Sequence, residues 1–115
     1  MLNLTKQQTI AEHRKMWRWI ADETKKQGRI VEKAEYFDAM GISPEDRPAG
    51  NCYCCDYTDG NCLKCPIEWG GDYGTCLDRY TYDDGKGLFG QWIHTNNPEE
   101  AARLAHKIAE LPERR

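Results

Sequence analysis

The sequence predicts a mainly α-helical fold in which long N-terminal and C-terminal helices pack around a loop-rich central segment. Near both ends of the chain, apolar residues recur at spacings of three and four, as on the buried face of a helix. Eight of the ten glycines and all six cysteines lie between residues 50 and 91. At 115 residues, with 39% hydrophobic and 30% charged residues, the chain fits a single domain, residues 1–115, with a modest core.

The first predicted helix spans residues 5–27. Thr5 and Gln8 match a capping box, and Gly28 can take the left-handed conformation that ends a helix. The side chains predicted to share its buried face are Ile10, His13, Trp17, Ile20 and Thr24. Trp19 points in a different direction from Trp17. It either packs at the edge of the core or anchors a partner, because exposed tryptophans are favoured at interfaces.

A shorter helix is expected over residues 32–40, with Val31, Tyr36, Phe37 and Met40 on its apolar side and Gly41 as its stop. Two prolines then stiffen a connector over residues 43–50. The cysteine-rich segment spans residues 50–92 and is expected to form turns, with one short hairpin as an option and a strand or helical turn near residues 88–93.

The last helix is predicted over residues 98–111. Asn97 suits its N-cap and Pro98 its first turn, and Pro112 is expected to end it. Its predicted buried face consists of Ala101, Leu104, Ala105, Ile108 and Leu111.

The net charge of −3 is unevenly distributed. Residues 50–97 carry three Lys or Arg against seven Asp or Glu, so the cysteine-rich segment is acidic. Zinc fingers that bind nucleic acid carry basic residues around the metal, so this pattern favours a protein partner over a nucleic acid. No apolar run is long enough for a signal peptide or a membrane span, which leads us to expect a cytoplasmic protein with reduced thiols.

Two Cys-x-x-Cys pairs in the central segment predict a metal centre. Cys52 and Cys55 form the first pair, and Cys62 and Cys65 form the second. Two such pairs, separated by a short loop, are typical of one structural zinc ion with four thiolate ligands. The sequence therefore predicts that this ion staples the central segment to the rest of a mainly α fold.

The other two cysteines are alternates for this site. Cys54 neighbours Cys55, so we interpret it as a small buried side chain or a free thiol. Cys76 could replace Cys52 as the fourth ligand. An iron–sulfur cluster is a minor alternative, because Cys65-Pro66 resembles a ferredoxin ending, although the preceding cysteine run is missing. A disulfide framework in an exported protein is a further alternative.

The sequence gives no sign of an enzyme. The three histidines, His13, His94 and His106, are weak ligand candidates, and a closed tetrathiolate site leaves no position for substrate. A thioredoxin-type pair needs a βαβ setting, which the pattern does not supply. The phosphate-binding glycine loop and the zinc-deaminase spacing are also missing.

The order of motifs resembles a group of small, cysteine-rich, zinc-knuckle-like proteins from bacteria and their phages. The resemblance rests on segments spread over most of the chain: residues 13–20, 52–57, 62–69, 87–92 and 108–112. It implies a prokaryotic or viral accessory protein with a metal knuckle.

These observations lead us to expect a non-enzymatic zinc-binding factor that binds and modulates a host protein, with Trp19 and Trp69 as candidate partner anchors. A nucleic-acid-binding accessory protein is the first alternative, motivated by basic residues on the first helix: Arg14, Lys15, Arg18, Lys25 and Lys26. A thiol redox protein, which needs reactive rather than metal-bound cysteines, is the second.

Overall fold

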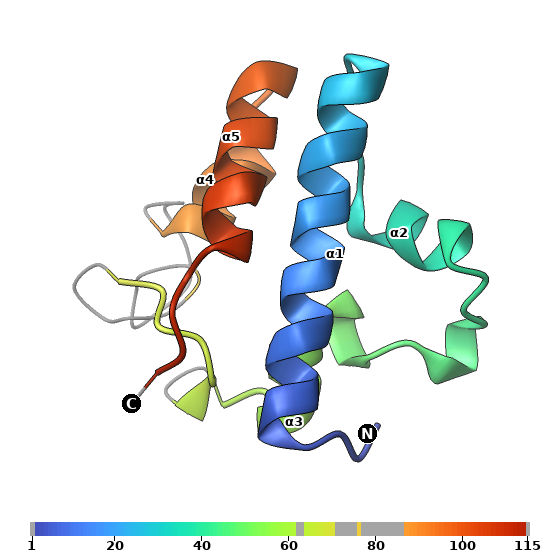
Figure 1. Cartoon of the computed structure of the whole chain (residues 1–115), viewed down its shortest axis with the longest axis vertical. Helices are drawn as coiled ribbons and strands as arrows, with labels where there is room; N and C mark the ends of the chain where they lie inside the picture. The colour runs from blue at the N-terminus through green and yellow to red at the C-terminus, as the bar shows by residue number, and fades with distance from the viewer. Residues whose placement is uncertain (1, 62–63, 71–75, 77–86, 115) are drawn as a thin grey trace.

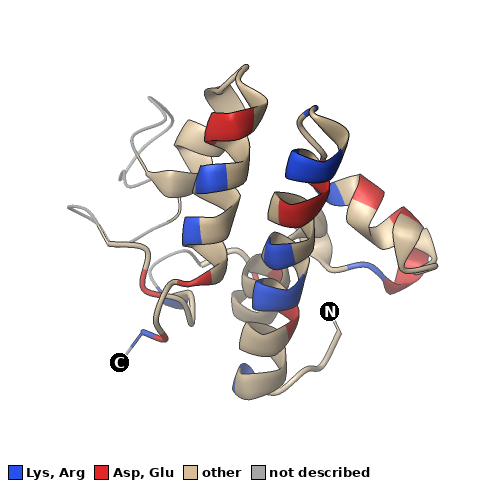
Figure 2. Ribbon diagram, turned by 45° about the horizontal axis from the view of Figure 1, so that its top comes forward, with Lys and Arg blue, Asp and Glu red and all other residues tan. Residues whose placement is uncertain are grey.

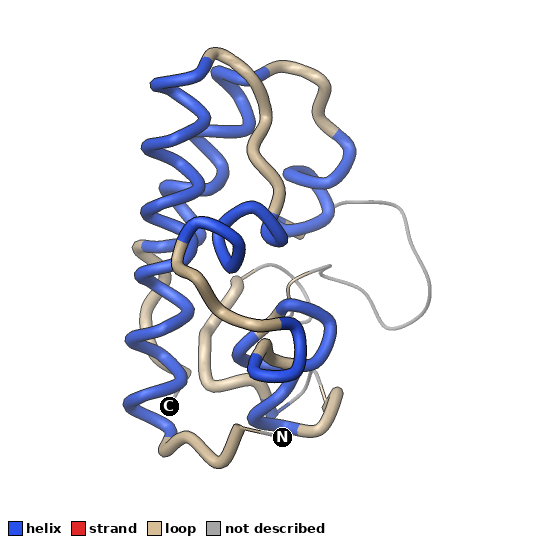
Figure 3. The backbone as a smooth tube through the Cα atoms, turned by 90° about the vertical axis from the view of Figure 1, so that its right-hand side faces the viewer, coloured by secondary structure: helices blue, strands red, loops and turns tan. Residues whose placement is uncertain are grey.

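A computed structural model describes residues 2–61, 64–70, 76 and 87–114. The described part is mainly helical, which confirms the mainly α part of the predicted fold class, whereas the predicted zinc staple of the central segment stays a prediction. Its helices are α1 (Lys6–Gln27), α2 (Lys33–Ala39), α3 (Tyr53–Thr58), α4 (Leu88–His94) and α5 (Pro98–Ala109), with short 3₁₀ turns η1 (Pro44–Asp46) and η2 (Ala49–Asn51). No strand is present among these residues, as Figure 3 shows, and Ile67 and Glu113 form one isolated antiparallel bridge.

The frame of the molecule is the antiparallel pair α1 and α5, which lie side by side (Figure 1). Each helix turns one apolar stripe inward, because residues three and four apart share a helix face. Ile10, Met16, Trp17 and Ile20 of α1 are buried, as are Ala101, Leu104, Ala105 and Ile108 of α5. The alanines of α5 allow close approach of the two helices.

Local signals fix the ends of these helices. Thr5 and Gln8 form the reciprocal hydrogen bonds of a capping box at the start of α1, and Gly28 ends the helix with a φ of 67°. The Asn97 side chain accepts a hydrogen bond from the Glu100 N–H at the start of α5. The helix α5 ends at Ala109 rather than at residue 111, because Glu110 caps its last turn.

The smaller helices pack around this frame. Helix α2 contacts α1 through the fully buried Tyr36 and Phe37, whereas Met40 is 39% exposed and does not belong to the apolar side predicted for it. Helix α4 packs on α5, and its Trp92 makes an edge contact with Trp17 at a ring-centroid distance of 4.9 Å. The predicted strand or helical turn near residues 88–93 is therefore the helix α4.

Helix α3 carries the first cysteine pair and packs against α1. Its Tyr53 and Cys54 are buried in the same core cluster as α1 and α5. We predicted turns for this part of the chain, with one short hairpin as an option, and not a helix. The helix forms because burial of these two side chains outweighs the weak helix propensity of the local sequence. None of the described helices is both long and apolar enough to cross a membrane.

Replacement of Trp17 by Ala tests the aromatic contact between α1 and α4. Trp17 is 2% exposed and lies edge-on to both Phe89 and Trp92. We expect a loss of about 3–5 kcal/mol in the free energy of unfolding, measured by urea denaturation. The matched control is Trp19→Ala, at a half-buried position on the same helix, with an expected loss of about 1 kcal/mol. Equal losses for the two variants would contradict this account of the core.

A candidate thiolate metal centre

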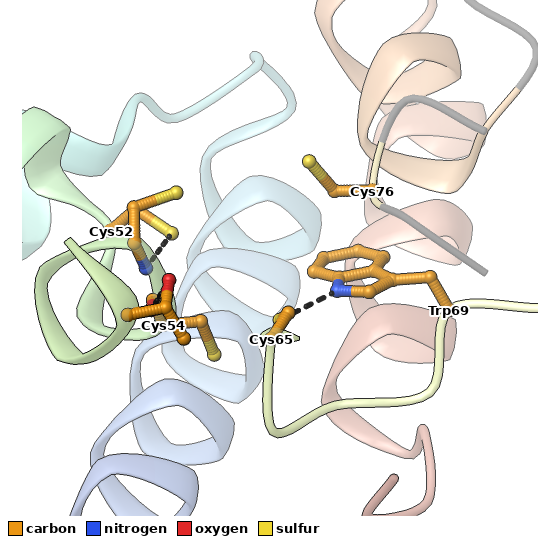
Figure 4. Close-up of a pocket in the computed structure, with 7 residues that line it drawn as sticks. Cys52, Cys54, Cys65, Trp69 and Cys76 are labelled. Atoms are coloured by element: carbon orange, nitrogen blue, oxygen red, sulfur yellow. Dashed lines mark hydrogen bonds between the residues drawn. The ribbon is translucent and has the colours of Figure 1, made fainter. Parts of the chain in front are cut away.

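Five cysteines from three separate parts of the chain line one small cavity. Cys52, Cys54 and Cys55 come from the start of α3, Cys65 comes from the following loop, and Cys76 lies close to α4 (Figure 4). Thr58 and Trp69 complete the lining. The cavity measures about 20 Å³, which is room for one small atom or ion and too little for an organic substrate. None of the five cysteines forms a disulfide.

Cys52 and Cys55 meet across the first turn of α3. Cys52 is the N-cap of the helix, and its sulfur accepts a hydrogen bond from the Cys55 N–H at 3.3 Å. A hydrogen bond with the Cys55 side chain is the main cause that lowers the pKa of Cys52 to about 6. The ammonium of Lys33 contributes to the same shift. The lowered pKa of Cys52 therefore favours the thiolate form of this sulfur at the start of α3.

Lys33 reaches this end of the site from α2. Its Nζ lies 3.3 Å from the Gly50 carbonyl oxygen and 4.7 Å from the centre of the Phe89 ring. The carbonyl and the π face of the ring hold the ammonium in a half-buried position, where its charge is less screened than on the surface. Lys33 thus supplies a positive charge that favours the thiolate form of Cys52.

Cys65 lies on the opposite side of the cavity, next to Trp69. The Trp69 indole N–H donates a hydrogen bond to the Cys65 sulfur over 3.3 Å. The pKa of Cys65 falls to about 7, first because Cys54 hydrogen-bonds to it and also because of the Trp69 N–H. Trp69 is only 7% exposed, so it supports the cysteine site and is not available as a surface anchor for a partner.

Cys54 is the most buried of the five, at 1% exposure. Its sulfur lies 3.6 Å from Nδ1 of His13, and its contact with Cys65 together with burial raises its pKa far above the ordinary value. These contacts and burial favour the neutral thiol of Cys54 while no metal is bound. Spacing had suggested a small buried side chain at this position, and that reading holds. The contacts with His13 and Cys65, however, were not foreseen.

His13 joins the core of α1 to the cysteines. It is 1% exposed, and its ring makes an edge contact with Trp69 at 5.6 Å. Burial lowers its pKa to about 4, and the nearby backbone of Ile108 offsets only part of this effect. The other two histidines, His94 and His106, lie on the surface, and His106 faces Glu110.

Residues near both chain ends hold the cysteine-bearing segment. The backbone N–H of Leu2 donates to the Asp56 carboxylate at 2.8 Å, and the Ala49 N–H donates to the same side chain at 3.0 Å. Burial opposes ionisation of Asp56, but these two donors hold its pKa below the ordinary range. At the other end, Arg114 N–H donates to the Pro66 carbonyl at 2.7 Å.

The cavity is lined by cysteine sulfurs, which are ligands that zinc prefers, but the described residues do not surround one point as the ligands of a bound metal do. Among the described residues, no group of three or more His, Cys, Asp or Glu side chains is arranged to hold a metal ion. Cys62, one of the four predicted ligands, lies outside the described residues. The donor chemistry nevertheless fits zinc, since two sulfurs favour the thiolate form and receive N–H donors, as sulfur ligands of zinc do.

Comparison of the chain with protein-family models, with curated proteins and with solved structures finds no match. The function must therefore be inferred from the site itself.

Replacement of His13 by Gln tests the burial of the imidazole. Because the folded-state pKa is depressed from 6.5 to about 4, the unfolded chain binds more protons between these values. The stability due to neutral His13 is complete above pH 6.5 and is lost as the pH falls towards 4, a change of about 3 kcal/mol. Urea denaturation of metal-free protein at pH 7 and pH 4 should show this loss on top of the loss from carboxylates with lowered pKa values, such as Asp56, and His13→Gln should remove the His13 part alone. The same slope in both proteins would contradict the assignment.

Proposed function

We propose that the chain is a zinc-binding protein in which one structural zinc ion staples the cysteine-bearing segment to the α1–α5 frame. The observation that carries this proposal is the gathering of five thiols from three parts of the chain around a cavity of ionic size. A small domain with a thin core gains stability from such a staple, because metal binding is available only to the folded state.

Three of the four predicted ligands, Cys52, Cys55 and Cys65, line the cavity, and we propose them as zinc ligands. Cys62 takes the fourth position if the two Cys-x-x-Cys pairs act together, as their spacing predicts. Cys76 is its competitor, because it lines the cavity. Cys54 is excluded from the ligand set, since it neighbours Cys55 and its sulfur is engaged with His13.

A site of this kind is structural. Four thiolates fill the coordination sphere of zinc and leave no position for a water or a substrate. The described residues that line the cavity are five cysteines, Thr58 and Trp69, and none of them is a carboxylate or a histidine that could act as a general base beside the metal. The function is therefore carried by the surface that the zinc-stapled fold presents.

We propose that this surface binds another protein, as expected of an accessory factor that modulates a host protein. The charge distribution supports a protein rather than a nucleic acid. Basic and acidic side chains alternate along α1 (Figure 2), and Arg14 is engaged with the Leu111 carbonyl oxygen at 3.0 Å. No continuous basic stripe follows this helix, and phosphate binding needs one. Trp19, half-buried against Tyr36, is the remaining candidate anchor.

Elemental analysis of the native protein tests the metal. We expect one zinc per chain and a gain of four titratable thiols after chelation, because four ligand sulfurs become available. Chelation should also lower the melting temperature by more than about 10 °C, since the zinc contribution to the free energy of unfolding is lost. Iron in place of zinc, with a brown colour, would indicate an iron–sulfur cluster instead.

Single substitutions identify the ligands. Cys52→Ser and Cys65→Ser should each lower the zinc content sharply, and of Cys62→Ser and Cys76→Ser only one should do so. The matched control is Cys54→Ala, which removes a buried thiol of the same cavity and should keep the zinc. Full zinc occupancy in the Cys52 or Cys65 variant would contradict the proposed site.

Co-purification tests the partner. Zinc-loaded protein immobilised through an exposed lysine and mixed with host lysate should retain a specific protein, and Trp19→Ala should weaken its retention. Binding to DNA or RNA that weakens with rising salt, measured by fluorescence anisotropy, would instead support the nucleic-acid alternative. Retention of no specific protein would count against the interaction role.

A further inference from the structure

The cysteines of the cavity differ in their access to solvent. Cys52, Cys55 and Cys76 are half-buried, whereas Cys54 and Cys65 are 1% and 7% exposed, and of the half-buried three only Cys52 and Cys55 meet within one turn of helix. A small oxidant arriving from solvent can therefore reach the first pair before the second. The more exposed pair is also the one whose two sulfurs face each other across a single turn of helix.

The local backbone suits a bond between these two sulfurs. Cys52 is the N-cap and Cys55 the third residue of α3, the positions whose side chains and N–H groups meet in helix capping. Residues three apart on a helix have Cβ atoms about 5–6 Å apart, and a disulfide needs about 3.5–4.5 Å. Cys52 has an extended backbone, with φ −131° and ψ 110°, so it can close this difference without unwinding the helix.

We propose that Cys52 and Cys55 form a reversible disulfide with a low-molecular-weight disulfide as oxidant, and that this bond releases the metal. The inference rests on the proposed zinc site, because both cysteines are among its ligands. The zinc staple would then be sensitive to redox conditions, and the surface that it orders would be present only when thiols are reduced.

The reaction proceeds by two thiol–disulfide exchanges. In the first, the Cys52 thiolate attacks one sulfur of oxidised glutathione, and one glutathione thiolate leaves. In the second, the Cys55 thiolate attacks the Cys52 sulfur of the mixed disulfide, and the second glutathione thiolate leaves. The two protein thiolates lose two electrons, the glutathione disulfide gains them, and zinc departs with two ligands gone.

The buried thiols stay reduced in this scheme. Cys54 is engaged with His13, and Cys65 accepts the Trp69 N–H hydrogen bond. Neither sulfur presents the exposed surface that in-line attack on glutathione disulfide requires. Cys65 thus remains in place as a ligand, and reduction of the Cys52–Cys55 bond restores the site.

The experiment compares zinc-loaded and chelator-stripped protein in glutathione buffers of increasing oxidised fraction. Remaining thiols are alkylated after an acid quench and located by fragmentation mass spectrometry, while a chromophoric indicator measures zinc release. We expect loss of two thiols, at Cys52 and Cys55, with one zinc released per disulfide, and both changes should reverse after reduction and zinc addition. Stripped protein should be oxidised faster than zinc-loaded protein.

Two variants test the order of attack. In stripped protein, Cys55→Ser should stop at a glutathione adduct on Cys52, because the resolving thiol is missing, and Cys52→Ser should form no disulfide with Cys55. Cys54→Ala is the matched control and should still form the Cys52–Cys55 disulfide. Circular dichroism checks that each variant keeps the helix content of stripped wild type.

Failure of the inference and failure of the zinc site give different results. Oxidation at Cys54, Cys65 or Cys76 instead of the Cys52–Cys55 pair, or no adduct on Cys52 in the Cys55→Ser variant, would overturn the inference even if zinc is bound. A protein that binds no zinc but forms the Cys52–Cys55 disulfide would overturn the proposed zinc site, and with it metal release, while leaving the thiol chemistry standing.

Discussion

Burial of the apolar stripe of α1 is the interaction on which the remaining structure depends. Helices α2, α3 and α5 all contact α1, and α4 is held through α5 and the Trp17–Trp92 contact. The cysteine cavity belongs to the same core, because His13 of α1 touches both the Cys54 sulfur and the Trp69 ring. The site is thus a continuation of the hydrophobic core and not a module attached to its surface.

The electrostatics of the cavity are consistent with the proposed zinc ion. Cys52 and Cys65 favour the thiolate form, and the Cys55 N–H, the Trp69 N–H and the Lys33 ammonium are the positive groups or dipoles that stabilise them. Several thiolates close together repel one another, so these few groups leave negative charge to be compensated. A divalent ion would neutralise the negative charge of the thiolates, whereas oxidation to a disulfide would remove that charge.

Sequence predicts the parts of the fold that local chemistry fixes. The Thr5 capping box, the Gly28 stop and the Asn97 N-cap each act within a few residues, so the frame could be read from the chain. Helix α3 could not, because it depends on burial of Tyr53 and Cys54 against distant α1. The same limit applies to the site. The cysteine pairs were visible as spacing, but His13 and Lys33 reach the site only through tertiary packing, and the local hydrogen bond from Trp69 to Cys65 has no sequence signal of its own.

The contacts between residues 66–68 and residues 112–114 affect the order in which the cysteine site can form during synthesis. Pro66 and Glu68 bond to Arg114 and Pro112, and Ile67 bridges to Glu113. On the ribosome, residues 66–68 emerge well before their partners at 112–114. The hydrogen bonds between these two segments can therefore form only after the residues of α5 have been synthesised, and the proposed metal site would be completed at that late stage.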